Sequence, residues 1–219
     1  ETDTKDKDTW YSLQKSISDA DFNKVYRIPE LKRALNGSLE EYRNNSRTTA
    51  AEDIKPELQF HKLQLIRNEL TKLSEIYGLP QFRYPEFLTP YEFNPAVADS
   101  VYRYLNMADN IFTGMFNDAS EKKDRFYNLN NNKLDKLRDD YFNYKLEEIV
   151  TKYFERNKIL IYNNSLVQNT DPIYLDPQKR GITGFRTHFY APAKYIFGIK
   201  TNTFLFNISL VLLSTILLY

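Results

Sequence analysis

The chain has 219 residues, of which 42% are hydrophobic and 27% are charged, and its formal net charge is +1. This length suffices for one domain with a hydrophobic core plus an appendage, and the composition excludes a chain that is disordered throughout. Because the sequence has no cysteine, disulfides, zinc–thiolate sites and thiol catalysis are excluded.

The charges are unevenly distributed along the chain. Asp176 is the last acidic residue, whereas Lys179, Arg180, Arg186, Lys194 and Lys200 follow it. A basic tract that runs into an apolar segment suits anionic lipid headgroups, while the charges of the preceding residues alternate in sign and offer no basic face to a nucleic acid. We therefore expect a lipid bilayer as a partner, and no nucleic acid.

The first eight residues, ETDTKDKD, are polar and lack apolar periodicity, so residues 1–16 are predicted to form a linker. A helical domain is expected over residues 17–176. Its first helix has Ser18 as a candidate N-cap, followed by apolar residues at roughly helical spacing. Pro29 is expected to break or restart this helix, and the composition of residues 44–49 predicts a loop.

The next helix begins at Pro56, which suits the first position of a helix, and ends before Gly78. Its apolar residues recur at intervals of three and four, and they are Leu63, Ile66, Leu70, Leu73 and Tyr77. This spacing predicts one apolar stripe that faces one partner.

Residues 79–93 carry three prolines among aromatic residues and exclude a long helix or a central strand. We expect an extended segment laid over the helices. Two interpretations of its aromatic side chains are open: they line a groove for an apolar or sugar-like ligand, or they pack onto the helices, which we favour. The candidate groove residues are Tyr84, Phe87, Tyr91 and Phe93.

Two further helices are predicted. One starts at Asn94-Pro95 and buries apolar residues up to Met115, and the other covers residues 118–156 around a polar middle at residues 130–132. A continuous apolar stripe is expected on the second half of the latter helix, from Leu134 to Phe154. Residues 159–168 are predicted either to form a short strand or to prolong that helix.

Amphipathic helices gain most of their stability by packing their apolar faces, so these helices need one another. The fold class predicted is all-α, a helical bundle of about four helices with a Pro/aromatic-rich irregular segment, followed by a C-terminal transmembrane helix fragment.

Residues 203–219 contain no charged residue and predict the start of a transmembrane helix that is cut off before its end, because a hydrocarbon core of ~30 Å needs ~20 apolar residues. Asn207, Ser209, Ser214 and Thr215 leave open the alternative of a buried helix in a soluble domain. Residues 177–202 are predicted to form a basic, aromatic juxtamembrane segment. Its predicted membrane-interface residues are Arg186, Tyr190, Lys194, Tyr195, Phe197 and Lys200.

The sequence offers little catalytic chemistry. Glu57 and His61 are the only pair with metal-ligand spacing, and a solvated histidine is the favoured interpretation. The adjacent acids Glu147 and Glu148 read as helix surface, and neither a glycine-rich phosphate loop nor a G-x-S-x-G motif occurs. We therefore expect a non-enzyme, with no catalytic, cofactor-binding or metal-binding residues.

Three segments carry a resemblance to a known family. Residues 187–198, THFYAPAKYIFG, are followed by the apolar run, and residues 22–31 and 60–69 contain further matching patterns. Together they resemble the region between the fifth and sixth membrane helices of Bacteroidetes ABC transporters of the ABCG-like type, which join an ATPase domain to a type-2 permease. The resemblance covers most of the chain.

The resemblance implies a non-catalytic extracytoplasmic domain of an ATP-driven exporter, which interacts with substrate or an envelope partner. It implies an inner-membrane location with the soluble part facing the periplasm, and ATP and Mg²⁺ bound elsewhere in the parent protein. The expected partners are the remaining membrane helices, the ATPase domain and a second copy in a homodimer. The alternative is a membrane-anchored helical binding or scaffold protein unrelated to transport.

One observation opposes the periplasmic location. Basic residues on the flank of a span usually place that flank in the cytoplasm, but this rule weakens for segments beyond ~60 residues, which translocate largely regardless of charge. We therefore keep the extracytoplasmic expectation.

Overall fold

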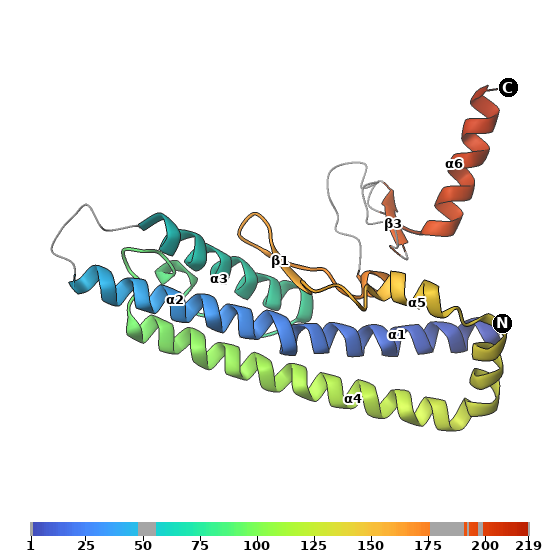
Figure 1. Cartoon of the computed structure of the whole chain (residues 1–219), viewed down its shortest axis with the longest axis horizontal. Coiled ribbons are helices and arrows are strands. Elements are labelled where there is room, and N and C mark those ends of the chain that lie inside the picture. The colour runs from blue at the N-terminus through green and yellow to red at the C-terminus, as the bar shows by residue number, and fades with distance from the viewer. Residues whose placement is uncertain (1, 48–55, 176–190, 192, 197–198, 219) are drawn as a thin grey trace. The chain divides into compact units, whose positions relative to one another are not determined.

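The computed structural model describes residues 2–47, 56–175, 191, 193–196 and 199–218. The chain divides into two compact units, which we call the body unit (Glu1–Leu129 with Asn157–Gln168) and the tail unit (Asn130–Arg156 with Asn169–Tyr219). Helices dominate the described residues, which confirms the predicted all-α class (Figure 1).

The body unit begins with a long helical rod made of α1 (Thr2–Phe22), the π-helix η1 (Asn23–Arg27) and α2 (Ile28–Arg47). The predicted linker over residues 1–16 is therefore wrong from Thr2 onward, and Ser18 lies inside α1 instead of capping it. Because a helix extends easily once it is nucleated, a polar segment without glycine or proline can prolong it without an apolar stripe. The predicted loop is likewise helical up to Arg47, and residues 48–55 lie outside the described residues.

Pro29 restarts the helix without breaking it. In the π-turn before it, the N–H of Ile28 donates to the carbonyl of Asn23, five residues back. Proline has no N–H to donate, and in a regular helix its ring clashes with the carbonyl four residues earlier. The wider turn over residues 23–27 is the local feature that accompanies the proline.

Helix α3 (Pro56–Tyr77) has the predicted bounds and stops at Gly78, which has a φ of 67°. Helix α4 (Pro95–Tyr141) starts after Asn94, whose Oδ1 accepts hydrogen bonds from two N–H groups of the first turn at 3.0 and 3.2 Å. This asparagine cap and the following proline explain why the start was predictable.

The predicted boundary between two helices near residue 118 is wrong, because α4 continues through it to Tyr141. It kinks at Asn130 (φ −127°, ψ 16°) inside the predicted polar middle. The chain then forms the separate helix α5 (Tyr144–Thr151), which Asn143 caps by accepting from the N–H of Leu146.

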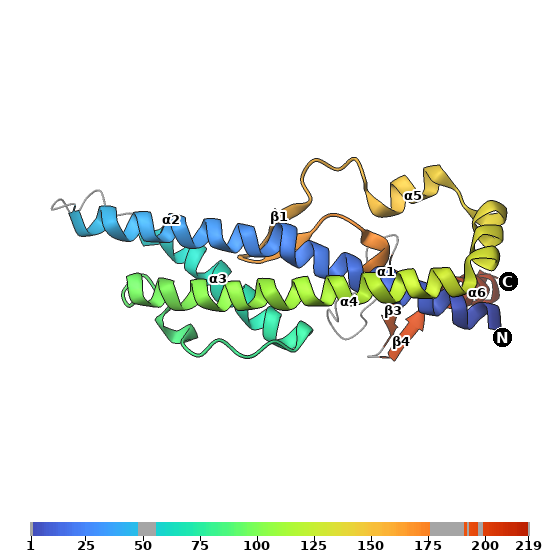
Figure 2. The same ribbon diagram turned by 90° about the horizontal axis from the view of Figure 1, so that it is seen from below.

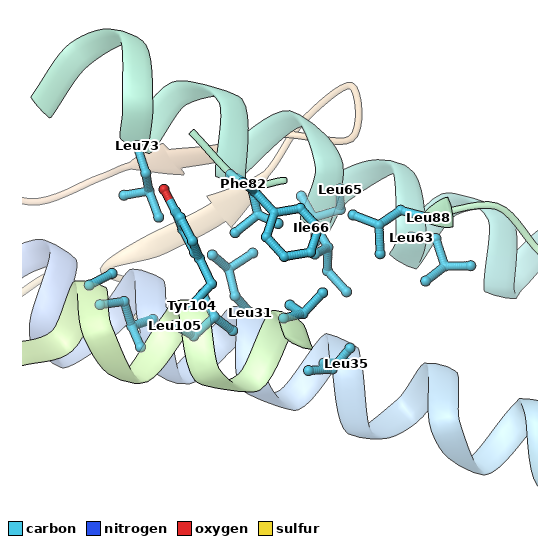
Figure 3. Packing of buried hydrophobic residues seen from close by; sticks show 14 of the residues in the cluster. Leu31, Leu35, Leu63, Leu65, Ile66, Leu73, Phe82, Leu88, Tyr104 and Leu105 are labelled. Carbon is cyan, nitrogen blue, oxygen red and sulfur yellow. The ribbon is translucent and has the colours of Figure 1, made fainter. Parts of the chain in front are cut away.

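The core of the body unit lies between α2, α3 and α4, and residues 79–93 close it with the 3-10 turn η3 (Pro85–Phe87) (Figure 3). The rod of α1 and α2 lies alongside α4 in both views (Figure 2). The largest fully buried apolar side chains are Phe22, Ile28, Leu31, Leu35, Leu63, Ile66, Leu70, Leu73, Phe93, Leu105 and Phe112. The predicted stripe of α3 is thus the centre of the core.

Residues 159–168 form a hairpin, which decides between the two predictions for them. Strand β1 (Ile159–Ile161) pairs antiparallel with β2 (Leu166–Gln168). Asn163 and Asn164 both have positive φ, at 48° and 50°, as the two central residues of a type I′ turn require.

The tail unit contains α5, the 3-10 turn η4 (Pro172–Tyr174), the antiparallel strands β3 (Ala193–Ile196) and β4 (Ile199–Asn202), and α6 (Thr203–Leu218). The apolar stripe expected up to Phe154 is not buried, since its members from Tyr141 onward are exposed. Over the part of the chain that the structure describes, no helix is both long and apolar enough to cross a membrane.

Candidate functional site

A charged residue lies within the apolar stripe of α3. Glu69 follows Ile66 by three residues and precedes Leu73 by four, so it faces the same side as both. Its side chain is 0% exposed. A carboxylate in this position needs charged or hydrogen-bonding partners, because burying an unpaired charge is costly.

Glu69 finds these partners on three segments. Its Oε1 accepts from the backbone N–H of Leu166 at 2.9 Å, from the Ser165 hydroxyl at 3.2 Å and from Lys72 Nζ at 2.7 Å. Its Oε2 lies 3.2 Å from Nε of Arg27. One carboxylate therefore joins the turn side of the hairpin to α3 and to the π-turn.

The π-turn holds Arg27 in place. The guanidinium donates to Asn23 Oδ1 at 2.6 Å and to the Tyr77 hydroxyl at 3.3 Å. It also lies over the rings of Phe22 and Tyr77, at 5.3 and 5.6 Å from their centroids. The cation is buried against aromatic faces, an arrangement that favours arginine over lysine.

The hairpin turn binds the same helix through Asn164. Its Nδ2 donates to Gln64 Oε1 at 2.5 Å, its carbonyl accepts from Asn68 Nδ2 at 2.9 Å, and its Oδ1 lies 3.2 Å from Nδ1 of His61. His61, Gln64 and Asn68 follow one another at intervals of three and four, which places them on one face of α3. We call His61, Gln64, Asn68 and Glu69 the hairpin seat.

The polar groups of the hairpin seat hold the hairpin on α3. Both carboxylate oxygens of Glu69 face cations or donors of the protein, so the group is not directed at a reacting atom. Within the described ranges, no group of three or more His, Cys, Asp or Glu side chains is arranged to hold a metal ion. His61 is exposed and faces Asn164, while the structure records no contact that joins it to Glu57.

The four candidate groove residues do not converge on one surface. Phe93 packs in the core with its ring edge-on to Tyr42 at 6.4 Å, whereas Tyr91 is 96% exposed. Tyr84 and Phe87 are partly exposed neighbours with ring centroids 6.1 Å apart. Packing onto the helices, the interpretation favoured from sequence, therefore applies to Phe93.

Half of the predicted membrane-interface residues fall on undescribed parts of the chain. Arg186, Tyr190 and Phe197 lie outside the described residues, and Tyr195 and Lys200 are described only as register partners in the β3–β4 hairpin. Lys194 is the member of the set whose side chain is described, and its Nζ lies 4.6 Å from the centroid of the Phe206 ring in α6.

Sequence analysis missed the hairpin seat, although two signals for it were present. Glu69 interrupts an apolar stripe, which indicates a buried charge that needs a partner. Asn163-Asn164 within a β-branched and aromatic run indicates a two-residue turn, because asparagine tolerates positive φ better than most residues.

No family model, curated protein or solved structure matches this chain. What the protein does must therefore be inferred from its own residues and contacts.

Proposed function

We propose that the chain is a non-catalytic, extracytoplasmic helical domain of an ATP-driven exporter permease of the ABCG-like type, held at the membrane by α6. One observation carries the membrane attachment: α6 has no buried residue, and its large apolar side chains are exposed all around the helix. A helix that is apolar on every side needs apolar surroundings on every side. The exposed apolar residues are Phe204, Leu205, Ile208, Leu210, Val211, Leu212, Leu213, Ile216, Leu217 and Leu218.

The start of α6 is fixed by the segment that precedes it. Asn202 Oδ1 accepts from the N–H of Phe204 at 2.8 Å, and the Thr203 hydroxyl donates to the carbonyl of Ala191 at 2.6 Å. Lys194 over the Phe206 ring adds a cation at the same end. A cation and aromatic rings at the start of an apolar helix suit the headgroup level of a bilayer.

The depth of insertion follows from the length of α6. Its 16 residues rise about 24 Å at 1.5 Å per residue, compared with the ~30 Å hydrocarbon core. The proposal therefore requires α6 to enter the bilayer from one side, and it does not require this helix alone to complete a crossing.

The transporter part of the proposal rests on the resemblance of residues 22–31, 60–69 and 187–198 to ABCG-like permeases. In that arrangement ATP and Mg²⁺ bind to an ATPase domain elsewhere in the parent protein, and this domain contacts substrate or an envelope partner. The hairpin seat supports a non-catalytic role, because its polar groups are engaged with the hairpin and, at Glu69, with Arg27 and Lys72.

The membrane attachment is tested by a charge placed in α6. Leu212→Lys in the full chain should lower the partition constant onto liposomes about a hundredfold, since a lysine at the centre of an inserted helix costs ~2.5–3.5 kcal/mol. Tyr91→Lys is the control, because it introduces the same charge at a residue that is 96% exposed in the body unit. Equal flotation of both variants with liposomes at high salt would refute insertion by α6.

The side of the membrane and the parent protein need separate tests. The chain has no cysteine, so Tyr91→Cys gives a single reporter in a full-length parent from which any cysteines outside this chain have been removed. Labelling of intact cells by an impermeant thiol reagent, once it has passed the outer membrane, supports the extracytoplasmic side, and labelling only after lysis contradicts it. A phosphate-loop cassette encoded in the same parent supports the exporter, whereas insertion without one favours the membrane-anchored scaffold.

A further inference from the structure

The hairpin of β1 and β2 is held to the body unit mainly by polar contacts. Leu166 is its one residue in the buried core cluster of the described chain, at 2% exposure, and Ile159 packs partly against it. Leu160, Ile161 and Val167 are exposed. Segments with few buried apolar contacts open locally at lower free energy than a packed core.

The position of the hairpin along the chain gives such opening a consequence. The chain passes between the body and tail units three times, after Leu129, Arg156 and Gln168. The last two passages are the two ends of the hairpin segment, and the first lies at the non-helical Asn130 of α4. A hairpin held on α3 therefore fixes two of the three passages.

We propose that the hairpin Ile159–Gln168 is a releasable latch, with the hairpin seat of α3 as its catch, and that its opening releases the two chain passages at its ends from α3 while the helical core stays folded. This inference does not depend on the exporter assignment, because its residues lie in the body unit and make the same contacts in any parent protein.

Glu69 is suited to a catch that opens and closes. When the hairpin leaves, Glu69 loses the Leu166 N–H and the Ser165 hydroxyl as donors, but it keeps Arg27 and Lys72. The carboxylate is thus still paired with two cations in the open state. An open state without an orphaned buried charge is accessible, whereas one that strands a charge is not.

The core keeps its own contacts when the latch opens. Its other buried residues come from α2, α3, α4 and residues 79–93, which pack on one another without the hairpin. We therefore expect two levels of protection from hydrogen exchange, a lower one for residues 159–168 and a higher one for residues 63–73 and 101–112.

Two variants distinguish the side-chain contacts of the turn with α3 from the backbone conformation of the turn. Asn164→Gly keeps the positive φ but removes the side-chain contacts with His61 and Gln64. Asn163→Gly is the matched control, because it makes the same change at a neighbour of equal φ for which the structure records no contact with α3.

Hydrogen exchange of the full chain in detergent micelles, read by mass spectrometry, gives the first test. Asn164→Gly should speed exchange of residues 159–168 about tenfold and leave residues 63–73 and 101–112 within twofold of wild type, and Asn163→Gly should leave all three unchanged. If hairpin and core accelerate together, or if the two variants behave alike, the latch is refuted. Should Asn164→Gly fail to fold, Ser165→Ala, which removes one donor to Glu69, is judged by the same criteria.

The second test measures the release of the hairpin directly. Spin labels on cysteines introduced at the exposed positions Tyr91 and Ile161 report the distance between residues 79–93 and the hairpin, both within the body unit, in a cysteine-free background. Pulsed electron resonance should give a broader distance distribution in Asn164→Gly than in Asn163→Gly. Distributions of equal width would overturn the claim that the hairpin seat holds the hairpin.

Discussion

Helices α3 and α6 are both rich in apolar residues, but these residues are distributed differently. In α3 those from Leu63 to Leu73 are buried on one face, with charged residues such as Arg67 between them, while apolar residues nearer its ends are exposed. In α6 they are nearly continuous, no charge interrupts them and none is buried. The distribution of apolar positions therefore indicates whether a helix is built for a protein partner on one side or for apolar surroundings on all sides.

The same contrast appears along α4. Its buried residues run from Ala98 to Ala119 within the body unit, and those up to Phe112 belong to the core cluster. Beyond them Leu129 is 84% exposed and Tyr141 is 77% exposed. Helix α4 thus changes from a core element to an exposed one near its kink at Asn130, where it enters the tail unit.

The contrast between core and exposed apolar residues is tested most directly by replacing one residue of each kind with alanine. Phe112 is fully buried, and its ring lies edge-on to that of Tyr77 with the centroids 5.2 Å apart. Phe112→Ala should therefore lower the free energy of unfolding by about 3–5 kcal/mol. Leu212→Ala in α6 should change it by less than about 0.5 kcal/mol. Denaturant unfolding in micelles, followed by the fluorescence of the single tryptophan Trp10, measures both.

Trp10 reports on the body unit, because its ring lies 6.3 Å from that of Phe126. A large loss of stability in Leu212→Ala would show that α6 packs into the core, as in the soluble alternative raised from sequence.

The two units should also respond differently to removal of an arginine. Arg27 is buried beside Glu69, so Arg27→Met should destabilise the protein by about 3 kcal/mol, because it leaves the carboxylate with Lys72 as its one remaining cation. Arg138 is exposed and lies over the Phe142 ring at 5.4 Å, and Arg138→Met should cost less than about 1 kcal/mol. Thermal melting of the two variants side by side distinguishes them, and equal losses would contradict the buried network.

The sequence predicted well where local chemistry and packing agree. Pro56 and Gly78 bound α3, Asn94 and Pro95 start α4, and the stripe of α3 is the core. The predictions failed at residues 1–16, where a helix forms without an apolar pattern in the sequence. They also failed near residue 118, where a helix end was predicted and α4 continues.

The hairpin seat was out of reach for a physical reason. Glu69 and Leu166 are 97 residues apart, and periodicity within one helix does not indicate which distant segment supplies its partners. Arg27 is likewise placed by a π-turn whose extra residue shifts the helical phase. The position of Glu69 within the apolar stripe indicates a charge that needs a partner, but only the fold identifies that partner.

Two glycines of the body unit should respond in opposite ways to substitution by alanine. Gly78 ends α3 with a φ of 67°, so Gly78→Ala should cost about 1–2 kcal/mol through backbone strain, although no atom lies within 4 Å of the added Cβ. Gly114 is equally uncrowded but helical, and Gly114→Ala should stabilise by about 0.5–1 kcal/mol. Chemical denaturation should thus move the two midpoints in opposite directions, and shifts of the same sign would contradict the left-handed cap.

The smallest expected effect concerns a polar atom inside the core. Tyr104 is buried, and among the described residues its hydroxyl has no hydrogen-bond partner. Tyr104→Phe should therefore be neutral or stabilise by up to about 1 kcal/mol, because no hydrogen bond is lost and a buried polar group is removed. Tyr91→Phe, at an exposed residue, should leave the stability unchanged.

The pH dependence makes the Tyr104 effect measurable. Burial raises the pKa of the Tyr104 hydroxyl above its ordinary value of 10.0, because desolvation disfavours the phenolate. The unfolded chain then releases this proton first as pH rises, so the contribution of Tyr104 is fully present below pH 10.0 and is lost as pH rises through the folded-state pKa. The stability advantage of Tyr104→Phe over wild type should accordingly widen above pH 10.0, while Tyr91→Phe tracks wild type. An advantage that is constant across this range would show that Tyr104 ionises equally easily in the folded and unfolded chain, and that its hydroxyl reaches water.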